Sequence, residues 1–142
     1  MDPAVVRERL LLLAEYIEDL QEFSTFSLED LIRDKRDRRY LERTLQLAIE
    51  ACLDIGSHLI AELRFREPED NRDIFRILVE NGILGPEKRD DLTRMAGFRN
   101  VLVHDYARLD PAKLHWAVSH GLADLRYFAR EIKDRFIDLP PS

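Results

Sequence analysis

The residues best suited to chemistry lie close together near position 100. Arg99 carries a permanently charged, planar fork of N–H donors that matches the oxygens of a phosphate. His104 titrates near neutral pH and can take or give a proton. Asn100 could hold that imidazole in one tautomer, and Tyr106 could stack on a base or hydrogen-bond a phosphate. This pattern indicates a site that binds an anion and moves a proton beside it.

The position of Arg99 on its predicted helix leaves two interpretations open. At about 100° per residue, Arg99 lies in the middle of an apolar sector. That sector is formed by Leu92, Met95, Ala96, Leu102 and Val103. An unpaired buried charge is costly, so the guanidinium needs an acceptor or open water beside it. It either forms a structural ion pair with a carboxylate of a neighbouring helix, or it lines a polar cleft that receives an anion.

His104 does not share the side of the helix on which Arg99 lies. On an ideal helix, five residues place two side chains about 140° apart, whereas Asn100 lies one turn before His104 and on its side. Arg99 and His104 can therefore serve one site only if the helix ends or loosens near His104, or if the site draws on two chains. The sequence before Asp110 and Pro111 allows such an end.

Apolar residues recur at helical spacing through most of the chain, and no segment shows a useful length of β-strand alternation. A first helix begins at residues 2–3, where Pro follows Asp, and its pattern stops over residues 23–26. Ser27 and Asp30 form the pattern of a capping box, which opens a short helical stretch. A long helix is then predicted over residues 35–65.

The second half of the chain continues the helical pattern. Asn71 is predicted to cap a shorter helix, which stops at residues 81–82, an Asn-Gly pair. A helix over residues 86–104 carries the candidate site. Residues 110–111, Asp followed by Pro, are predicted to cap the last helix. Its apolar stripe consists of Leu114, Val118, Leu122, Leu125, Ala129, Ile132 and Phe136.

Length and composition narrow the class of protein. The 142 residues fit one domain spanning 1–142, which we expect to be an all-α, antiparallel bundle of four to five helices with short loops. The single cysteine, Cys52, permits no internal disulfide and is expected to be an ordinary buried thiol. No apolar run approaches the ~20 residues of a membrane helix, so we expect a cytoplasmic protein. The net charge of −6 means that any contact with nucleic acid needs a local positive potential.

Other features are weaker. The basic stretch over residues 33–39 is interrupted by two aspartates and is read as a solvated helix face, with a phosphate-steering patch as the lesser alternative. His58, His115 and His120 lack metal-ligand spacing, and we expect no metal and no cofactor. His58 is expected in the core or at a dimer contact, and the other two histidines on the surface. Trp116 is expected to be a packing anchor.

The motif of Arg, four residues, His, one residue and Tyr over residues 99–106 resembles the signature of the HepT-like branch of HEPN-domain ribonucleases. Residues 39–51 and 54–60 also resemble the long second helix of that family, so the resemblance covers most of the chain. It implies a homodimeric toxin of a toxin–antitoxin pair, with the motifs of two chains facing each other across a cleft. It also implies RNA as the substrate, with transfer RNA a candidate.

The resemblance further implies a role for each motif residue. Arg99 and His104 would be catalytic, with Asn100 and Tyr106 in supporting roles. RNA carries its own nucleophile, the 2′-hydroxyl, so cleavage needs a base, an acid and positive charge on the phosphate, without a metal. A twofold dimer would supply two copies of His104, one as base and one as acid. The implied partner is a minimal nucleotidyltransferase antitoxin, which would silence the toxin by attaching AMP to Tyr106.

Two other readings remain open at this point. The chain could be a non-catalytic helical partner that presents Tyr106, or a bound nucleotide, to a nucleotidyltransferase. It could also be a structural bundle in which Arg99 forms a buried ion pair.

Overall fold

Residues 2–105 and 109–137 are described by the computed structural model, and within them the chain forms six α-helices and one 3₁₀-helix. The α-helices are α1 (Pro3–Gln21), α2 (Leu28–Arg33), α3 (Lys35–Glu62), α4 (Asn71–Glu80), α5 (Arg89–His104) and α6 (Pro111–Phe136), and the 3₁₀-helix is η1 (Pro86–Lys88). The all-α prediction is confirmed. The expected number of four to five helices was too low for the described residues, because the short α2 and α4 each have their own cap.

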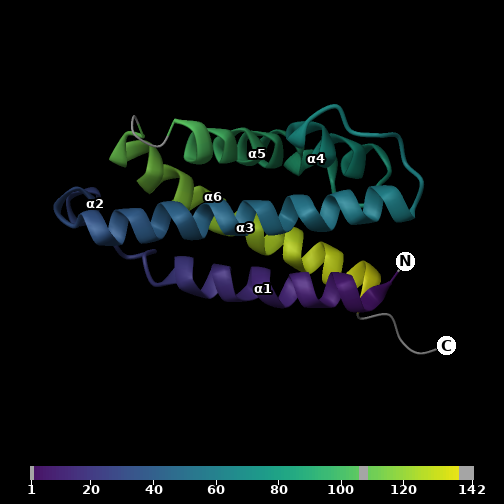
Figure 1. Ribbon diagram of the computed structural model, residues 1–142, viewed down its shortest axis with the longest axis horizontal. Helices are drawn as coiled ribbons and strands as arrows, with labels where there is room; N and C mark the ends of the chain where they lie inside the picture. The colour runs from purple at the N-terminus through teal and green to yellow at the C-terminus, as the bar shows by residue number, and fades with distance from the viewer. Residues whose placement is uncertain (1, 106–108, 138–142) are drawn as a thin grey trace.

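The helices form an antiparallel bundle around α3 (Figure 1). In that view α3 lies between α1 on one side and α4 and α5 on the other, while α6 starts beside the end of α5 and crosses behind α3. The chain direction reverses from α1 to α3, and again from α3 to α5. The C-terminal end of α5 therefore lies beside the N-terminal half of α3. Side chains of α3 accordingly surround the motif that begins at Arg99.

Local sequence signals explain where most helices begin. The carboxylates of Asp2 and Asp110 accept hydrogen bonds from backbone N–H groups in the first turns of α1 and α6, at 2.9 and 2.8 Å. Ser27 and Asp30 form the reciprocal capping box of α2. The predicted caps at Ser27 and Asp110 and the predicted start of α1 are confirmed, and Gly82, with φ of 72°, follows α4 as the predicted stop.

Three predicted boundaries were wrong. The cap of α4 is Asp70, not Asn71, because the Asp70 carboxylate accepts the Asp73 N–H at 2.8 Å. The long helix α3 ends at Glu62 rather than at residue 65, shortly before Arg64 takes a positive φ of 58°. The segment 86–104 is divided into η1 and α5, because a turn of 3₁₀ geometry precedes the α-helix.

One continuous apolar core joins all the α-helices. Its largest fully buried side chains include Phe75 of α4 and Phe128 of α6, whose rings meet edge to face with centroids 5.8 Å apart. Cys52 is also fully buried, and burial raises the pKa of its thiol, as expected for a structural cysteine. No helix in the described part of the chain is both long and apolar enough to cross a membrane.

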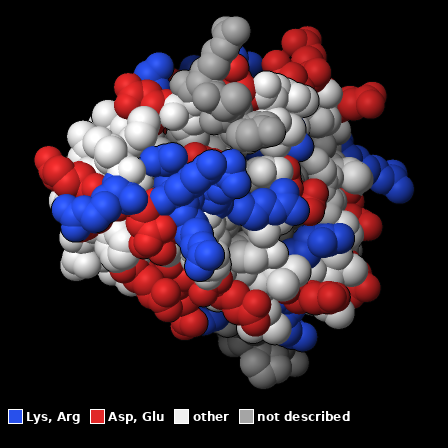
Figure 2. Space-filling view, turned by 60° about the vertical axis from the view of Figure 1, so that its left-hand side comes forward, with Lys and Arg blue, Asp and Glu red and all other residues white. Residues whose placement is uncertain are grey.

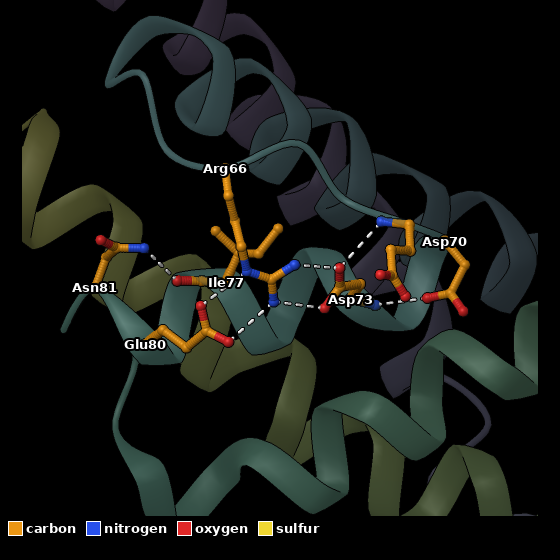
Figure 3. A network of polar contacts seen from close by, with 7 residues as sticks. Arg66, Asp70, Asp73, Ile77, Glu80 and Asn81 are labelled. Atoms are coloured by element: carbon orange, nitrogen blue, oxygen red, sulfur yellow. Dashed lines mark hydrogen bonds and ion pairs between the residues drawn. The ribbon is translucent and has the colours of Figure 1, made fainter.

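An arginine clamp fixes the connection between α3 and α4 (Figure 3). Arg66 donates to both carboxylate oxygens of Asp73, at 2.6 and 2.8 Å, and to both of Glu80, at 3.0 and 2.9 Å. Asp73 also accepts the backbone N–H of Glu69 at 3.0 Å. These hydrogen bonds, above all those from Arg66, lower the pKa of Asp73 to about 2. The clamp therefore holds the loop against the start and the end of α4.

Two glycines allow close approach between helices. At Gly56 of α3, an added Cβ would lie 2.5 Å from Cγ2 of Ile74 in α4, so this contact has no room for a methyl group. At Gly97 of α5, an added Cβ would lie 2.5 Å from a terminal nitrogen of Arg72, whose exposed side chain crosses the glycine from α4. The contact at Gly56 is with a packed core side chain, whereas the contact at Gly97 is with the far end of a flexible arginine side chain.

Candidate functional site

The motif occupies the last turns of α5, which the core holds in place. Leu92, Met95, Ala96 and Leu102 are buried, as their shared sector predicted, and Val103 is half-buried. The backbone N–H of Asp105 donates to the carbonyl of Val101 at 2.9 Å, which closes the helix immediately after His104. The predicted helix end at His104 is thus confirmed.

Arg99 is paired with a carboxylate of α3. Its Nε donates to Oε1 of Glu50 at 3.2 Å, and its Nη2 lies 3.1 Å from the same oxygen. Gln46, one turn earlier on α3, donates from Nε2 to that oxygen at 3.1 Å. Three donors therefore converge on one oxygen, and this oxygen holds the guanidinium of α5 against α3.

The ion pair is open to solvent. The side chain of Arg99 is 25% exposed and that of Glu50 is 30% exposed. Arg99 contacts Oε1 of Glu50 through the edge of the guanidinium that carries Nε and Nη2. The two N–H groups of Nη1 have no partner among the described residues. Of the two interpretations of Arg99, the ion pair is confirmed. The pair is partly exposed to solvent, and the N–H groups of Nη1 are not used in it.

The other motif residues lie apart from Arg99 within one chain. Asn100 and His104 are exposed, and at about 100° per residue His104 lies about 140° around α5 from Arg99. No contact between Arg99 and His104 occurs in the described part of the chain. Tyr106 lies outside the described residues. The structure therefore brings Arg99 together with Glu50 and Gln46, and it leaves His104 facing solvent at the helix end.

Sequence reasoning missed Glu50 and Gln46. They lie one turn apart at the edge of the α3 stripe, next to Ile49 and Leu45, where polar residues usually face solvent. The sequence signal that could have identified these two residues is a polar i, i+4 pair beside an apolar stripe. Their pairing with Arg99, however, depends on the register of α3 against α5. That register is a property of tertiary packing.

A hollow of about 350 Å³ lies between α3 and α5 and includes Gln46, the neighbour of this pair. Its α3 wall consists of Arg39, Glu42, Arg43 and Gln46, and its α5 wall consists of Leu102 and Val103. Burial raises the pKa of Glu42, while the charges of Arg38 and Arg39 oppose that rise. The hollow is thus a mixed surface in which arginines lie beside apolar residues of the motif.

A second, mostly apolar groove of about 370 Å³ lies between α5 and α6, with Leu45 and Ile49 of α3 in its floor. Trp116 at its edge is 46% exposed, stacks on His120 and lies against Arg94 of α5. The prediction of Trp116 as a packing anchor was wrong, because the indole lies at the edge of this groove and not in the core.

The remaining histidines take different positions. His120 is exposed as predicted, whereas His115 is half-buried and its Nε2 lies 2.9 Å from the carbonyl of Phe26, which ties α6 to the turn before α2. His58 is half-buried, and its buried Nε2 has no hydrogen-bond partner among the residues that the structure describes. Within 2–105 and 109–137, no three His, Cys, Asp or Glu side chains gather in a way that would hold a metal ion.

Comparison with known proteins identifies relatives over the whole chain. A tRNA nuclease HepT of Aphanizomenon flos-aquae is 31% identical over 139 residues, which are 98% of this chain and 95% of that protein. An mRNA nuclease HepT of Shewanella oneidensis is 36% identical over 89 residues, which are 63% of this chain and 67% of that protein.

Solved structures share the fold. One is described as a tri-AMPylated Shewanella oneidensis HEPN toxin in complex with MNT antitoxin; it has a TM-score of 0.84 at 27% identity and covers 95% of this chain and 100% of that chain. YutE of Bacillus subtilis has a TM-score of 0.84 at 23% identity, over 100% of this chain and 96% of that chain, and supports the fold alone. The family model described as Ribonuclease HepT-like matches residues 13–132. The chain therefore belongs to the HepT-like family of ribonucleases, as the motif from Arg99 to Tyr106 predicted.

Proposed function

We propose that this protein is the toxin of a toxin–antitoxin pair and cleaves RNA without a metal, using Arg99 and His104. The observation that carries the proposal is the state of Arg99, which is held by Glu50, is 25% exposed and has no hydrogen-bond partner for Nη1 within the described residues. A fixed, partly desolvated guanidinium is suited to binding a phosphate and to stabilising the charge that develops on it. Support also comes from the HEPN toxin whose fold this chain shares.

The chemistry requires one proton to leave and one to arrive. A base removes the proton of the 2′-hydroxyl, whose oxygen attacks the adjacent phosphorus, and the bond from phosphorus to the 5′-oxygen breaks. An acid protonates the departing 5′-oxygen, which leaves a 2′,3′-cyclic phosphate on one fragment and a 5′-hydroxyl on the other. An exposed imidazole such as that of His104 can fill either proton role.

The proposed site is completed by a second copy of the chain. One chain offers one motif histidine, which is exposed and lies about 140° around α5 from Arg99 of its own chain. A twofold axis near the end of α5 would place His104 of each chain in a common cleft, with one imidazole as base and the other as acid. It would also bring two copies of Arg99 together, which concentrates positive charge in a protein of net charge −6. Asn100, exposed one turn before His104, is proposed to orient that imidazole.

The cleavage assay incubates the purified protein with transfer RNA and with messenger RNA, each with and without EDTA. We expect cleavage that EDTA does not suppress. Transfer RNA is the proposed substrate, because the relative matched over nearly the whole chain is named a tRNA nuclease. Arg99→Ala should lower the rate by about 10²–10³-fold, the usual loss for one electrostatic contact to a transition state. Intact RNA with the wild-type protein, or full activity in His104→Ala, would contradict the proposal.

Regulation is proposed to act on Tyr106. The HEPN toxin with a similar fold is described as tri-AMPylated and in complex with MNT antitoxin. We propose that a minimal nucleotidyltransferase partner attaches AMP to Tyr106, two residues after His104, which adds bulk and negative charge where a phosphate must bind. Tyr106→Phe should stay toxic in cells that express the partner, and mass spectrometry should find AMP on the wild-type chain only. Silencing of Tyr106→Phe through AMP at another residue would contradict this assignment.

A further inference from the structure

Four polar residues form a straight row on one face of α3. Arg39, Arg43, Gln46 and Glu50 follow each other at spacings of four, three and four residues, which keeps them on one side of a helix. Eleven residues span about 16 Å along the axis. Glu50 ends the row at the guanidinium of Arg99, and Gln46 shares the same oxygen of Glu50. The row therefore leads away from the motif toward the start of α3.

The row borders the motif helix directly. Arg39, Arg43 and Gln46 line the hollow of about 350 Å³ together with Leu102 and Val103, which lie between Arg99 and His104 in the chain. A ligand that lies in this hollow therefore touches the same turn of α5 that carries the motif. Its polar wall is α3, and its apolar wall is the motif helix.

Both arginines are exposed, and neither forms an ion pair or hydrogen bond within the described residues, although the charge of Arg39 acts on Glu42. They lie one turn apart, so their charges repel each other across the helix surface. Figure 2 shows Lys and Arg side chains gathered across this end of the molecule, in a chain whose net charge is −6. A local concentration of unpaired positive charge is what an anionic polymer requires of an acidic protein.

We propose that Arg39 and Arg43 bind the phosphates of the RNA strand that flank the cleaved bond, so that the row is a track leading single-stranded RNA into the site. This inference rests on the proposed ribonuclease function. Arginine pairs with phosphates through its fork, and its planar guanidinium can also stack on an unpaired base. Glu42, the acidic member of the hollow, opposes the RNA, so the track binds more tightly when that charge is removed.

The test measures how RNA binding depends on salt. A short fluorescein-labelled single-stranded RNA is titrated with the full-length His104→Ala protein, which binds without cleaving, at about 50–200 mM NaCl. Each phosphate contact to a single strand contributes about 0.7 to the slope of log affinity against log salt. Arg39→Gln and Arg43→Gln should each reduce the slope by about 0.7, and the double variant by about 1.4. Glu42→Gln should tighten binding.

Arg130→Gln is the matched control. Arg130 is an exposed arginine near the far end of α6, and its loss changes the net charge by the same amount as each track variant. It should leave the slope unchanged. All variants should keep the thermal midpoint of the parent, since neither track arginine holds the fold.

The outcomes separate this inference from the proposed function. Suppose that the wild-type protein cleaves RNA and that the double variant keeps the slope of the Arg130→Gln control. The proposed role of Arg39 and Arg43 is then wrong, and the proposed ribonuclease function is retained. If the slope falls as expected but the wild-type protein leaves RNA intact, Arg39 and Arg43 bind RNA phosphates and the proposed cleavage is wrong. If the double variant instead changes the oligomeric state in sedimentation, the row is a protein contact and the inference fails. Absence of RNA binding would overturn both.

Discussion

Replacing Glu50 by Gln should weaken catalysis through Arg99, although Glu50 itself touches no substrate in the proposed mechanism. The amide keeps the shape and one acceptor oxygen but removes the negative charge. Arg99 stays charged, so its hydrogen bond to the amide oxygen remains charge-assisted, and the variant loses only the attraction between two partly exposed charges. Such a pair contributes at most about 1 kcal/mol. Because about 1.4 kcal/mol corresponds to a factor of ten, we expect kcat/KM to fall by about two- to five-fold.

The assay follows cleavage of a labelled RNA by the wild-type protein, Glu50→Gln, Arg99→Ala and the double variant. If Glu50 acts only by holding Arg99, the double variant should be no slower than Arg99→Ala alone. Asp54→Asn is the matched control, because Asp54 lies one turn further along α3 and pairs only loosely with Arg9, at 4.0 Å. Its activity should equal that of the wild type.

The stability of Glu50→Gln should change little. The Arg99–Glu50 pair is a quarter to a third exposed, and such pairs contribute at most about 1 kcal/mol to folding. Cleavage by Glu50→Gln at the wild-type rate would refute the reasoning, since Arg99 would then need no anchor. A double variant far slower than Arg99→Ala would also refute it, because Glu50 would then act by another route.

Three further predictions concern the scaffold. Asp73→Asn should lower the unfolding free energy by about 1–3 kcal/mol in urea at pH 7. Because the clamp depresses the Asp73 pKa to about 2, wild-type stability should fall between pH 4 and 2, and this loss should be absent in Asp73→Asn. By the same urea assay, Gly56→Ala should destabilise by about 1–3 kcal/mol through overpacking, whereas Gly97→Ala should be neutral or stabilising, because only a flexible arginine must move. Cys52 should resist thiol reagents until the protein is unfolded, as mass spectrometry can show.

The helices could be predicted from sequence because their signals are local. The Asp2, Ser27 and Asp110 caps each depend on a side chain that reaches its own backbone two or three residues away. At α4 the local signal was ambiguous, since Asp70 and Asn71 are both good capping residues. In the structure Asp70 accepts the N–H of Asp73, and the side chain of Asp73 is held in turn by Arg66 of the preceding loop.

The candidate site was predictable only in part, for a related reason. Helical spacing of about 100° per residue showed that Arg99 lies in an apolar sector and therefore needs a partner. It could not identify that partner as Glu50, which is 49 residues away. That pairing depends on how far α3 is shifted along α5, and many side chains decide the shift together. Helical spacing also predicted that His104 lies on another side of α5 from Arg99, and His104 is exposed in the structure.

The groove between α5 and α6 gives the protein an intrinsic optical reporter. Trp116 is the single tryptophan of the chain, so all indole emission comes from the edge of this groove. Its ring rests on His120 of its own helix and faces Arg94 of α5, so the signal depends on the distance between the two helices. Any movement of the motif helix relative to α6 during RNA binding or subunit assembly should therefore change the fluorescence of the unlabelled protein.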